Sequence, residues 1–409
     1  EYIFRACQLP ERTLEDLDFR LELALDLNET DNAVDTLTAI ARQGTVALEA
    51  VKDQTVLDLL IGAEQKPRSG DRLFLLLEAL FDADFRVAGG PSPDWAWERL
   101  AVLFLLRGDA VKAEQVVARI TSPGELIAFR ADNRFAAMVR ANPAHFDVAQ
   151  ARARNVEQAR ATVRKEPRSI RAVLELADTL MAQGKDREAL EITDEALVRV
   201  SSSPVAPYDG VARLLPWLRN ARSGALWSLG RWQESLDELE RASLLTEQGN
   251  ANVSHYLNLA WRDCELNRGP EALAALKHVD EGKTSPFGAM QRELVRAWAG
   301  VETEDPALVE RGLSYLRQHQ DDAPLALQRV LVFAGKLDEA ARVLVSRLDD
   351  PESRGEALMS LQELTELPRP PGGASKRFDA NWKKLIARKD VRDAVAAVGH
   401  IERYELPAP

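Results

Sequence analysis

A pair of apolar stripes separated by a glycine recurs along this chain, and this recurrence limits the fold more than any other feature of the sequence. It is clearest over residues 170–203, where apolar residues recur three or four positions apart, as on one face of a helix. The first stripe comprises Val173, Leu176, Ala177 and Leu180, and the second comprises Ala189, Ile192 and Ala196. Gly184 stands between the stripes, and glycine commonly ends a helix. The segment therefore predicts two antiparallel helices joined by a short turn.

The same arrangement returns before and after this segment. The predicted turns read Gly-Lys or Gly-Arg at Gly184, Gly230 and Gly335. Small residues occupy matching positions in the two helices of a pair. The clearest sets are Ala101 with Ala113, Ala177 with Ala189, Ser223 with Ser235, and Ala260 with Ala272. The distance between packed helices depends on the side chains at their contact, so we expect the helices of each pair to cross closely at these small residues.

This pattern resembles the tetratricopeptide repeat, a 34-residue unit that folds into a helix-turn-helix. The resemblance covers roughly residues 93–348. It implies an all-α fold, an α-α superhelix in which helix pairs stack into a solenoid. Strand signals are nearly absent from the sequence, in agreement with this class. A generic helical bundle, or a repeat built from another kind of helix pair, would show the same apolar periodicity.

Four regions follow from the extent of the repeat pattern. Residues 1–92 are predicted to be helical without the pattern, as a cap or as diverged repeats, because the end of a solenoid needs an atypical polar face. Residues 93–367 form the predicted repeat array. Residues 368–377, rich in proline and glycine, are the predicted linker. Residues 378–409 are a predicted helical segment that caps the last repeat or lies apart from it.

The charge and the cysteines of the chain narrow its expected partners. The net charge is −12, whereas nucleic-acid binders usually present a basic face, so we expect no nucleic-acid partner. No apolar run reaches the length of a membrane span. We therefore expect a soluble protein, either cytoplasmic or periplasmic or secreted after signal removal. Cys7 and Cys264 provide neither a disulfide framework nor a metal-binding spacing.

The sequence contains no recognisable catalytic motif. Its five histidines form neither His-x-x-x-His nor His-Glu-x-x-His, and it has no phosphate-binding loop and no nucleophile elbow. Cys264 lies within a predicted helix, where a cysteine usually serves as a small packing residue. We therefore expect no enzyme activity, no cofactor and no metal site.

The resemblance also implies where a partner would bind. In tetratricopeptide arrays the first helix of each pair lines a concave groove, and set positions on that helix face the ligand. Transfer of these positions to the units that begin at Ile170, Pro216 and Val253 gives the candidate groove residues Arg171, Asp178, Trp217, Asn220, Trp227, Ser254, Asn258 and Trp261. Tryptophan buries a large rigid area at interfaces, and in this family groove asparagines often bridge the backbone of an extended peptide.

The tryptophans and the family's carboxylate-binding positions qualify the groove residues further. Large aromatic residues also fill the space between repeats, so Trp217, Trp227 and Trp261 fit either the groove or the core. Some tetratricopeptide proteins hold a carboxy-terminal carboxylate with Lys and Arg at set groove positions. Here those positions carry Trp217, Asn220, Ser254 and Asn258, so the resemblance does not imply that partner.

The function that the sequence favours is a non-catalytic scaffold that binds a protein or peptide in the groove. This step is an analogy with the family, because fold alone does not determine function. Two alternatives belong to other classes. One is an enzyme or small-molecule binder with its site in the N-terminal region or in the groove, and the other is a structural subunit of an assembly.

Overall fold

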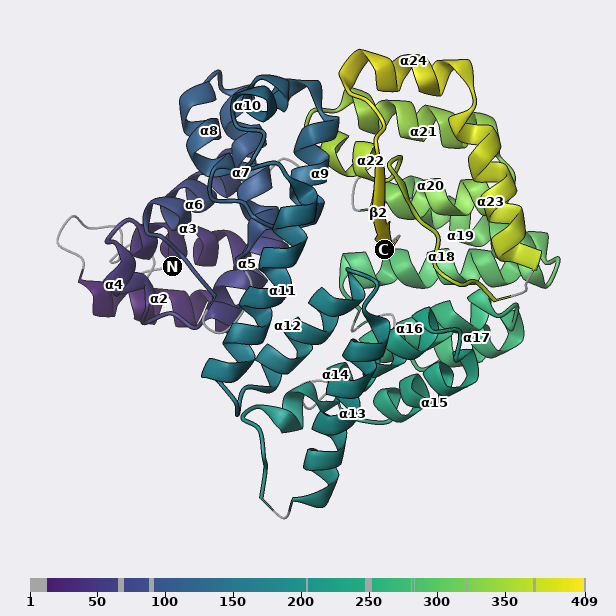
Figure 1. Cartoon of the computed structure of the whole chain (residues 1–409), viewed down its shortest axis with the longest axis horizontal. Coiled ribbons are helices and arrows are strands. Elements are labelled where there is room, and N and C mark those ends of the chain that lie inside the picture. Colours follow the sequence, from purple (N-terminus) through teal and green to yellow (C-terminus); the bar gives the residue numbers. More distant parts are fainter. Residues whose placement is uncertain are drawn as a thin grey trace. The chain divides into compact units, whose positions relative to one another are not determined.

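The described part of the chain folds mainly into helices. The computed structural model describes residues 13–64, 70–87, 92–203, 205–246, 252–280, 282, 284–320, 323–370 and 373–407; Cys7 lies outside them. Within these residues the elements are helices α2 to α24, one short 3-10 helix and one two-stranded sheet, which confirms the all-α class (Figure 1). Two compact units are present, residues 1–125 and 126–409.

The first unit is built from seven helices in its described part. They are α2 (Leu14–Asp26), α3 (Thr30–Ala41), α4 (Thr45–Leu48), α5 (Asp53–Glu64), α6 (Gly70–Asp82), α7 (Asp94–Leu106) and α8 (Ala110–Val117). The pair α7–α8 carries the repeat residues Ala101 and Ala113, both completely buried. This pair belongs to the first unit, although the sequence pattern groups it with the later repeats.

The second unit begins within α9 (Pro123–Ala131) and continues through short helices into an array of helix pairs. The lead-in consists of η1 (Asn133–Phe135), α10 (Ala136–Ala141) and α11 (Val148–Lys165). The pairs are α12 (Ile170–Met181) with α13 (Asp186–Ser202), α14 (Val211–Ser228) with α15 (Trp232–Ser243), α16 (Val253–Glu265) with α17 (Gly269–Leu276), α18 (Pro286–Glu302) with α19 (Pro306–Gln318), and α20 (Pro324–Phe333) with α21 (Leu337–Asp349). Each pair packs against the next.

The helices of a pair meet at the small residues that the sequence indicates. Ala177, Ala189, Ala260 and Ala272 are completely buried. In α14–α15 the corresponding serines bond to each other across the crossing, with their Oγ atoms 2.7 Å apart, and Ser235 Oγ also lies 2.8 Å from the backbone oxygen of Ser223. A buried hydroxyl needs such partners to offset its lost hydration, so serine can replace alanine here.

The turn within each pair places one residue in the left-handed conformation. At Gly184 (φ +70°) the next amide, that of Lys185, donates to Leu180 O at 2.9 Å. The same turn occurs at Gly108, Gly230 and Gly335. It matches a helix-ending motif that satisfies the last carbonyls, for which glycine is favoured because it has no Cβ.

The last part of the chain packs back onto the second unit. It comprises α22 (Arg354–Met359), β1 (Glu363–Thr365), α23 (Gly373–Ile386), α24 (Lys389–Val398) and β2 (Arg403–Pro407). Helix α23 begins inside the predicted linker, of which residues 371 and 372 are not described. Phe378 on α23 packs against Phe333 at a ring-centre distance of 4.7 Å, so α23 lies on the array.

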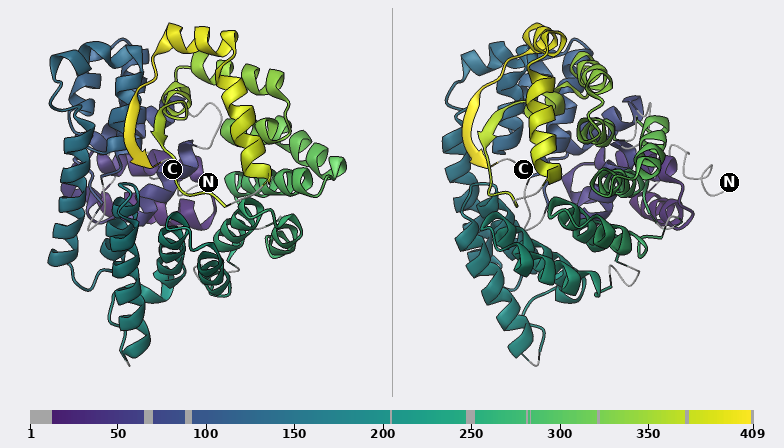
Figure 2. Two further views of the ribbon diagram at one scale, coloured as in Figure 1. Left: turned by 45° about the vertical axis from the view of Figure 1, so that its right-hand side comes forward. Right: turned by 90° about the vertical axis from the view of Figure 1, so that its right-hand side faces the viewer.

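The final described segment is a strand rather than a helix. Strand β2 pairs with β1 in parallel, and Figure 2 shows the two strands side by side in both views. Arg130 on α9 binds the Glu402 carboxylate through two hydrogen bonds of 2.9 Å, and Arg152 on α11 donates to Glu405 O at 2.8 Å. The strand forms because its backbone finds partners on segments distant in sequence, which a local helical pattern does not reveal.

Candidate functional site

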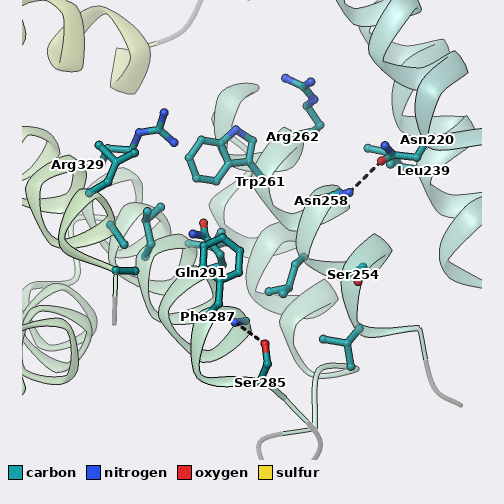
Figure 3. Close-up of a pocket in the computed structure, with 18 of the residues that line it drawn as sticks. Asn220, Leu239, Ser254, Asn258, Trp261, Arg262, Ser285, Phe287, Gln291 and Arg329 are labelled. Carbon is teal, nitrogen blue, oxygen red and sulfur yellow. Dashed lines mark hydrogen bonds between the residues drawn. The ribbon is translucent and has the colours of Figure 1, made fainter. Parts of the chain in front are cut away.

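An open groove of about 870 Å³ runs across successive helix pairs of the second unit. Its walls come mainly from the first helix of each pair, namely α14, α16, α18 and α20, with Glu356 added from α22. Most of the side chains labelled in Figure 3 belong to these helices, and Leu239 is added from α15. The volume lies in the range of ligand sites in proteins, about 300–1,000 Å³.

Local sequence fixes where the groove helices begin. Asn252 caps α16 by accepting from the His255 amide at 3.1 Å, while its own amide group donates to Ala242 O at 2.8 Å. Ser285 caps α18 by accepting from the Gly288 amide at 3.1 Å. Proline occupies the first turn of both α18 and α20, a position where it costs no helical hydrogen bond. The starts of α16, α18 and α20 are therefore well defined.

Exposed aromatic side chains form the apolar surface of the groove. Phe287 is 48% exposed and Trp217 is 37% exposed, high values for such large apolar residues. The Trp217 ring packs edge-on against His255, with ring centres 4.7 Å apart. Leu257 also lines this surface. A ligand that covered these rings would remove apolar area from water, which is favourable in proportion to the area buried.

A pair of asparagines bridges two helix pairs inside the groove. Asn258 on α16 donates through Nδ2 to Oδ1 of Asn220 on α14 at 2.9 Å (Figure 3). Among the described residues, neither the Asn220 amide group nor the Asn258 carbonyl oxygen has a further hydrogen-bond partner. The pair therefore offers donors and an acceptor side by side, which match the alternating groups of an extended backbone.

Two arginines supply positive charge at the groove. The Arg329 guanidinium lies 5.4 Å from the centre of the Trp261 ring, and that of Arg262 lies 4.2 Å from the Trp227 ring. Arg262 also pairs with Glu265 at 2.5 Å. Burial lowers the pKa of Arg329 from its usual value, and the more distant Glu356 and Glu265 charges oppose this effect. An anionic ligand would offset the poor solvation of the Arg329 charge.

The structure places five of the eight candidate groove residues together. Trp217, Asn220, Ser254, Asn258 and Trp261 all line the groove. The remaining three candidates, Trp227, Arg171 and Asp178, are not among its lining residues.

Trp227 lies in the core beneath Arg262 and is only 5% exposed. Arg171 and Asp178 lie on α12, one pair before the groove. Asp178 keeps part of its surface accessible to solvent, yet surrounding protein raises its pKa to about 7, and Glu175 adds to the effect.

Several groove residues were not among the candidates, notably Phe287, Gln291, Arg329 and Glu356. The first two lie on α18, a helix that the repeat pattern did not identify; its pair turns at Glu304, without the glycine found at Gly184, Gly230 and Gly335. Arg329 precedes the identified turn at Gly335 by less than two helical turns. Transfer of the family's groove positions to the repeat unit that contains Gly335 would have identified Arg329 as a groove residue.

The groove presents no recognisable catalytic centre among the described residues. No group of three His, Cys, Asp or Glu side chains there is arranged to hold a metal ion. Cys264 is completely buried, and burial raises the pKa of its thiol well above the usual value. The reactive thiolate form is therefore disfavoured. What the groove offers is contact area, backbone-matching amides and a cation.

No protein-family model matches the sequence, and a search of curated proteins gives no significant match. Within the described part of the chain, no helix combines the length and apolar character needed to cross a membrane.

Proposed function

We propose that this protein is a non-catalytic scaffold that holds an extended peptide segment of a partner protein in the groove formed by α14, α16, α18 and α20. The observation that carries the proposal is the combination, in one groove, of exposed aromatic rings and a bridging asparagine pair with unused donors and an acceptor. Aromatic surface supplies binding energy, whereas amide groups set the position of the backbone.

The repeat resemblance supports the same proposal. The first helices of successive pairs line the groove, as in the tetratricopeptide family, and left-handed turns join the helices of each pair. We propose that α12 to α21 are diverged repeats of this family. Stacked helix pairs of this kind commonly create extended concave binding surfaces.

A selection from random peptides tests the proposal. A library of 12-residue peptides displayed on phage would be selected against the full chain, and enriched peptides would be synthesised and their affinity measured by fluorescence anisotropy. We expect binding to fall at least about tenfold in the Trp217→Ala/Phe287→Ala variant, because the removed rings present most of the exposed aromatic area. Phe19→Ala is the matched control, since Phe19 is 53% exposed on α2 outside the groove.

The outcome separates peptide binding from the alternatives. Enriched peptides that bind the groove variant as tightly as the wild type would place the site elsewhere. If no peptide is enriched, the scaffold proposal fails. The volume of the groove then favours a small molecule, which thermal shift with a compound library would detect. A stable homo-oligomer in sedimentation experiments would instead favour a structural assembly subunit.

A further inference from the structure

Arg329 is the groove cation for which the described residues provide no ion pair with a carboxylate. Among the described residues its only assigned contact is with the Trp261 ring, 5.4 Å from the guanidinium carbon. Figure 3 shows the Arg329 side chain extended toward that ring. Stacking on an aromatic face orients a guanidinium while its N–H groups remain available for a planar anion.

The acidic residues close to this position are engaged by other arginines. Glu265, on α16, pairs with Arg262 at 2.5 Å. Glu356, on α22, pairs with Arg347 at 2.9 Å. No acidic side chain from α14, α18 or α20 lines the groove in the described residues. Within the described residues Arg329 therefore forms no ion pair, and the Glu356 and Glu265 charges act on it only at longer range, in a chain whose net charge is −12.

The surroundings of Arg329 specify more than a charge. Trp261, Phe287 and Leu257 line the same groove, so an anion bound at Arg329 would lie beside apolar surface. A bare inorganic anion would leave these rings uncovered. A segment with a carboxylate next to a large apolar side chain would satisfy both features at once.

We infer that the groove selects peptide segments in which an Asp or Glu side chain is followed or preceded by a large apolar residue. The side-chain carboxylate binds the Arg329 guanidinium, and the apolar residue covers Phe287 and Leu257. This inference rests on the proposed scaffold function and adds the chemistry of the partner. An internal acidic side chain is specified, rather than a chain terminus or a phosphate group.

Synthetic peptides test the inference. Peptides enriched in the phage selection, in which the carboxyl end is fused and cannot bind as a terminus, would be made with an amidated end. Each acidic residue would be exchanged for Asn or Gln, and binding to the wild type would be measured by fluorescence anisotropy. We expect the neutral peptide to bind at least about tenfold more weakly, as expected for the loss of a charge-assisted hydrogen bond.

Arg329→Gln provides the complementary arm. We expect this variant to bind the acidic peptide more weakly by a similar factor and to bind the neutral peptide as tightly as the wild type does. The effects of the protein change and the peptide change are then not additive. Arg213→Gln is the control, because Arg213 is exposed on α14 outside the groove and makes no ion pair among the described residues. The Arg329→Glu variant should regain part of its affinity when the acidic residue of the peptide is replaced by Lys.

The outcomes distinguish this inference from the scaffold function itself. If acidic and neutral peptides bind equally, or if Arg329→Gln binds the acidic peptide normally, the charge selection is wrong, although the scaffold stands. Failure to enrich any peptide overturns both proposals. Preference for a free carboxyl end, tested by adding the acid form of each peptide, would overturn the assignment of an internal side chain. Competition by a single-stranded oligonucleotide at equal affinity would point to phosphate.

Discussion

Asn258 and Asn220 join neighbouring helix pairs through a side-chain hydrogen bond of 2.9 Å that faces the groove. Because each amide keeps unused hydrogen-bonding capacity, we expect Asn258→Ala to weaken peptide binding by about 5- to 20-fold, the value of one or two hydrogen bonds. Its effect on the free energy of unfolding should remain below about 1 kcal/mol, since both side chains are partly exposed. Fluorescence anisotropy and urea unfolding measure the two quantities.

The matched control for this change is Gln233→Ala. Gln233 is an exposed amide on α15 that bonds to Asp237 and Arg268 away from the groove. It should leave peptide affinity unchanged. Equal affinities for wild type and Asn258→Ala would show that the asparagine pair has only a structural role.

The turn between α18 and α19 has a strained residue that can be relieved. Glu304 is exposed and adopts φ +54°, at the position that glycine occupies in the turns at Gly184, Gly230 and Gly335. A non-glycine residue in this conformation lowers stability by about 1–2 kcal/mol. Glycine avoids this strain, but part of the gain is lost because glycine makes the unfolded chain more flexible. We expect Glu304→Gly to stabilise the protein by about 0.5–1 kcal/mol in urea unfolding. Gly184→Ala, at φ +70°, should destabilise it by a comparable amount, and the same sign for both would refute the argument.

Close packing of α18 on α19 depends on Gly312. A Cβ added at this position would lie 2.7 Å from Ala297 Cβ and 2.8 Å from Glu293 O. Since neither atom can move without shifting a helix, Gly312→Ala should lower the free energy of unfolding by about 1–3 kcal/mol. Gly62→Ala in α5 is the control, because its Cβ meets only Thr30 Cγ2 at 3.8 Å. That change should stabilise by up to about 1 kcal/mol, as alanine favours helix.

The stability of the second unit should depend on pH through Glu302. Burial raises the pKa of Glu302 from 4.5 to about 8, despite opposing contacts with Gly269 and Trp298, and Asp263 adds to the increase. The folded state therefore binds its proton more tightly than the unfolded state. This contribution to stability is complete below about pH 4.5 and is lost as pH rises through about 8.

Glu302→Gln tests this dependence. The variant should match the wild type near pH 5 and exceed its free energy of unfolding by about 2 kcal/mol at pH 9, after allowance for solvent screening. Glu304→Gln, at an exposed neighbour, should leave the pH profile of the wild type unchanged. Parallel profiles for wild type and Glu302→Gln between pH 5 and pH 9 would contradict the assignment.

Part of the fold could be predicted because its signals are local. Apolar stripes and small crossing residues such as Ser223 and Ser235 mark helix pairs, most clearly where glycine ends the first helix. The turns at Asn267 and Glu304 have the same left-handed geometry without glycine. The pair α16–α17 was still identified by Ala260 and Ala272, whereas the pair α18–α19 was not identified. Strand β2 was missed for another reason, since its backbone partner β1 lies about 40 residues earlier in the chain.

The candidate site divides in a similar way. The repeat pattern placed Trp217, Asn220, Ser254, Asn258 and Trp261 on the helix faces that line the groove. It did not distinguish Trp227, which is buried beneath Arg262. It also did not single out Arg329, whose importance comes from the ion pairs made by the acids around it.

The sequence by itself determined the helical class, the pairing of neighbouring helices and the approximate helix faces, because periodicity and turn residues act over a few positions. The tertiary structure decided which of those faces meet, which tryptophans are covered, and which groove arginine forms no ion pair within the described residues. These properties depend on distances between helices that are remote in sequence. Burial and charge compensation are sums over all neighbours in space, and no local pattern specifies that sum.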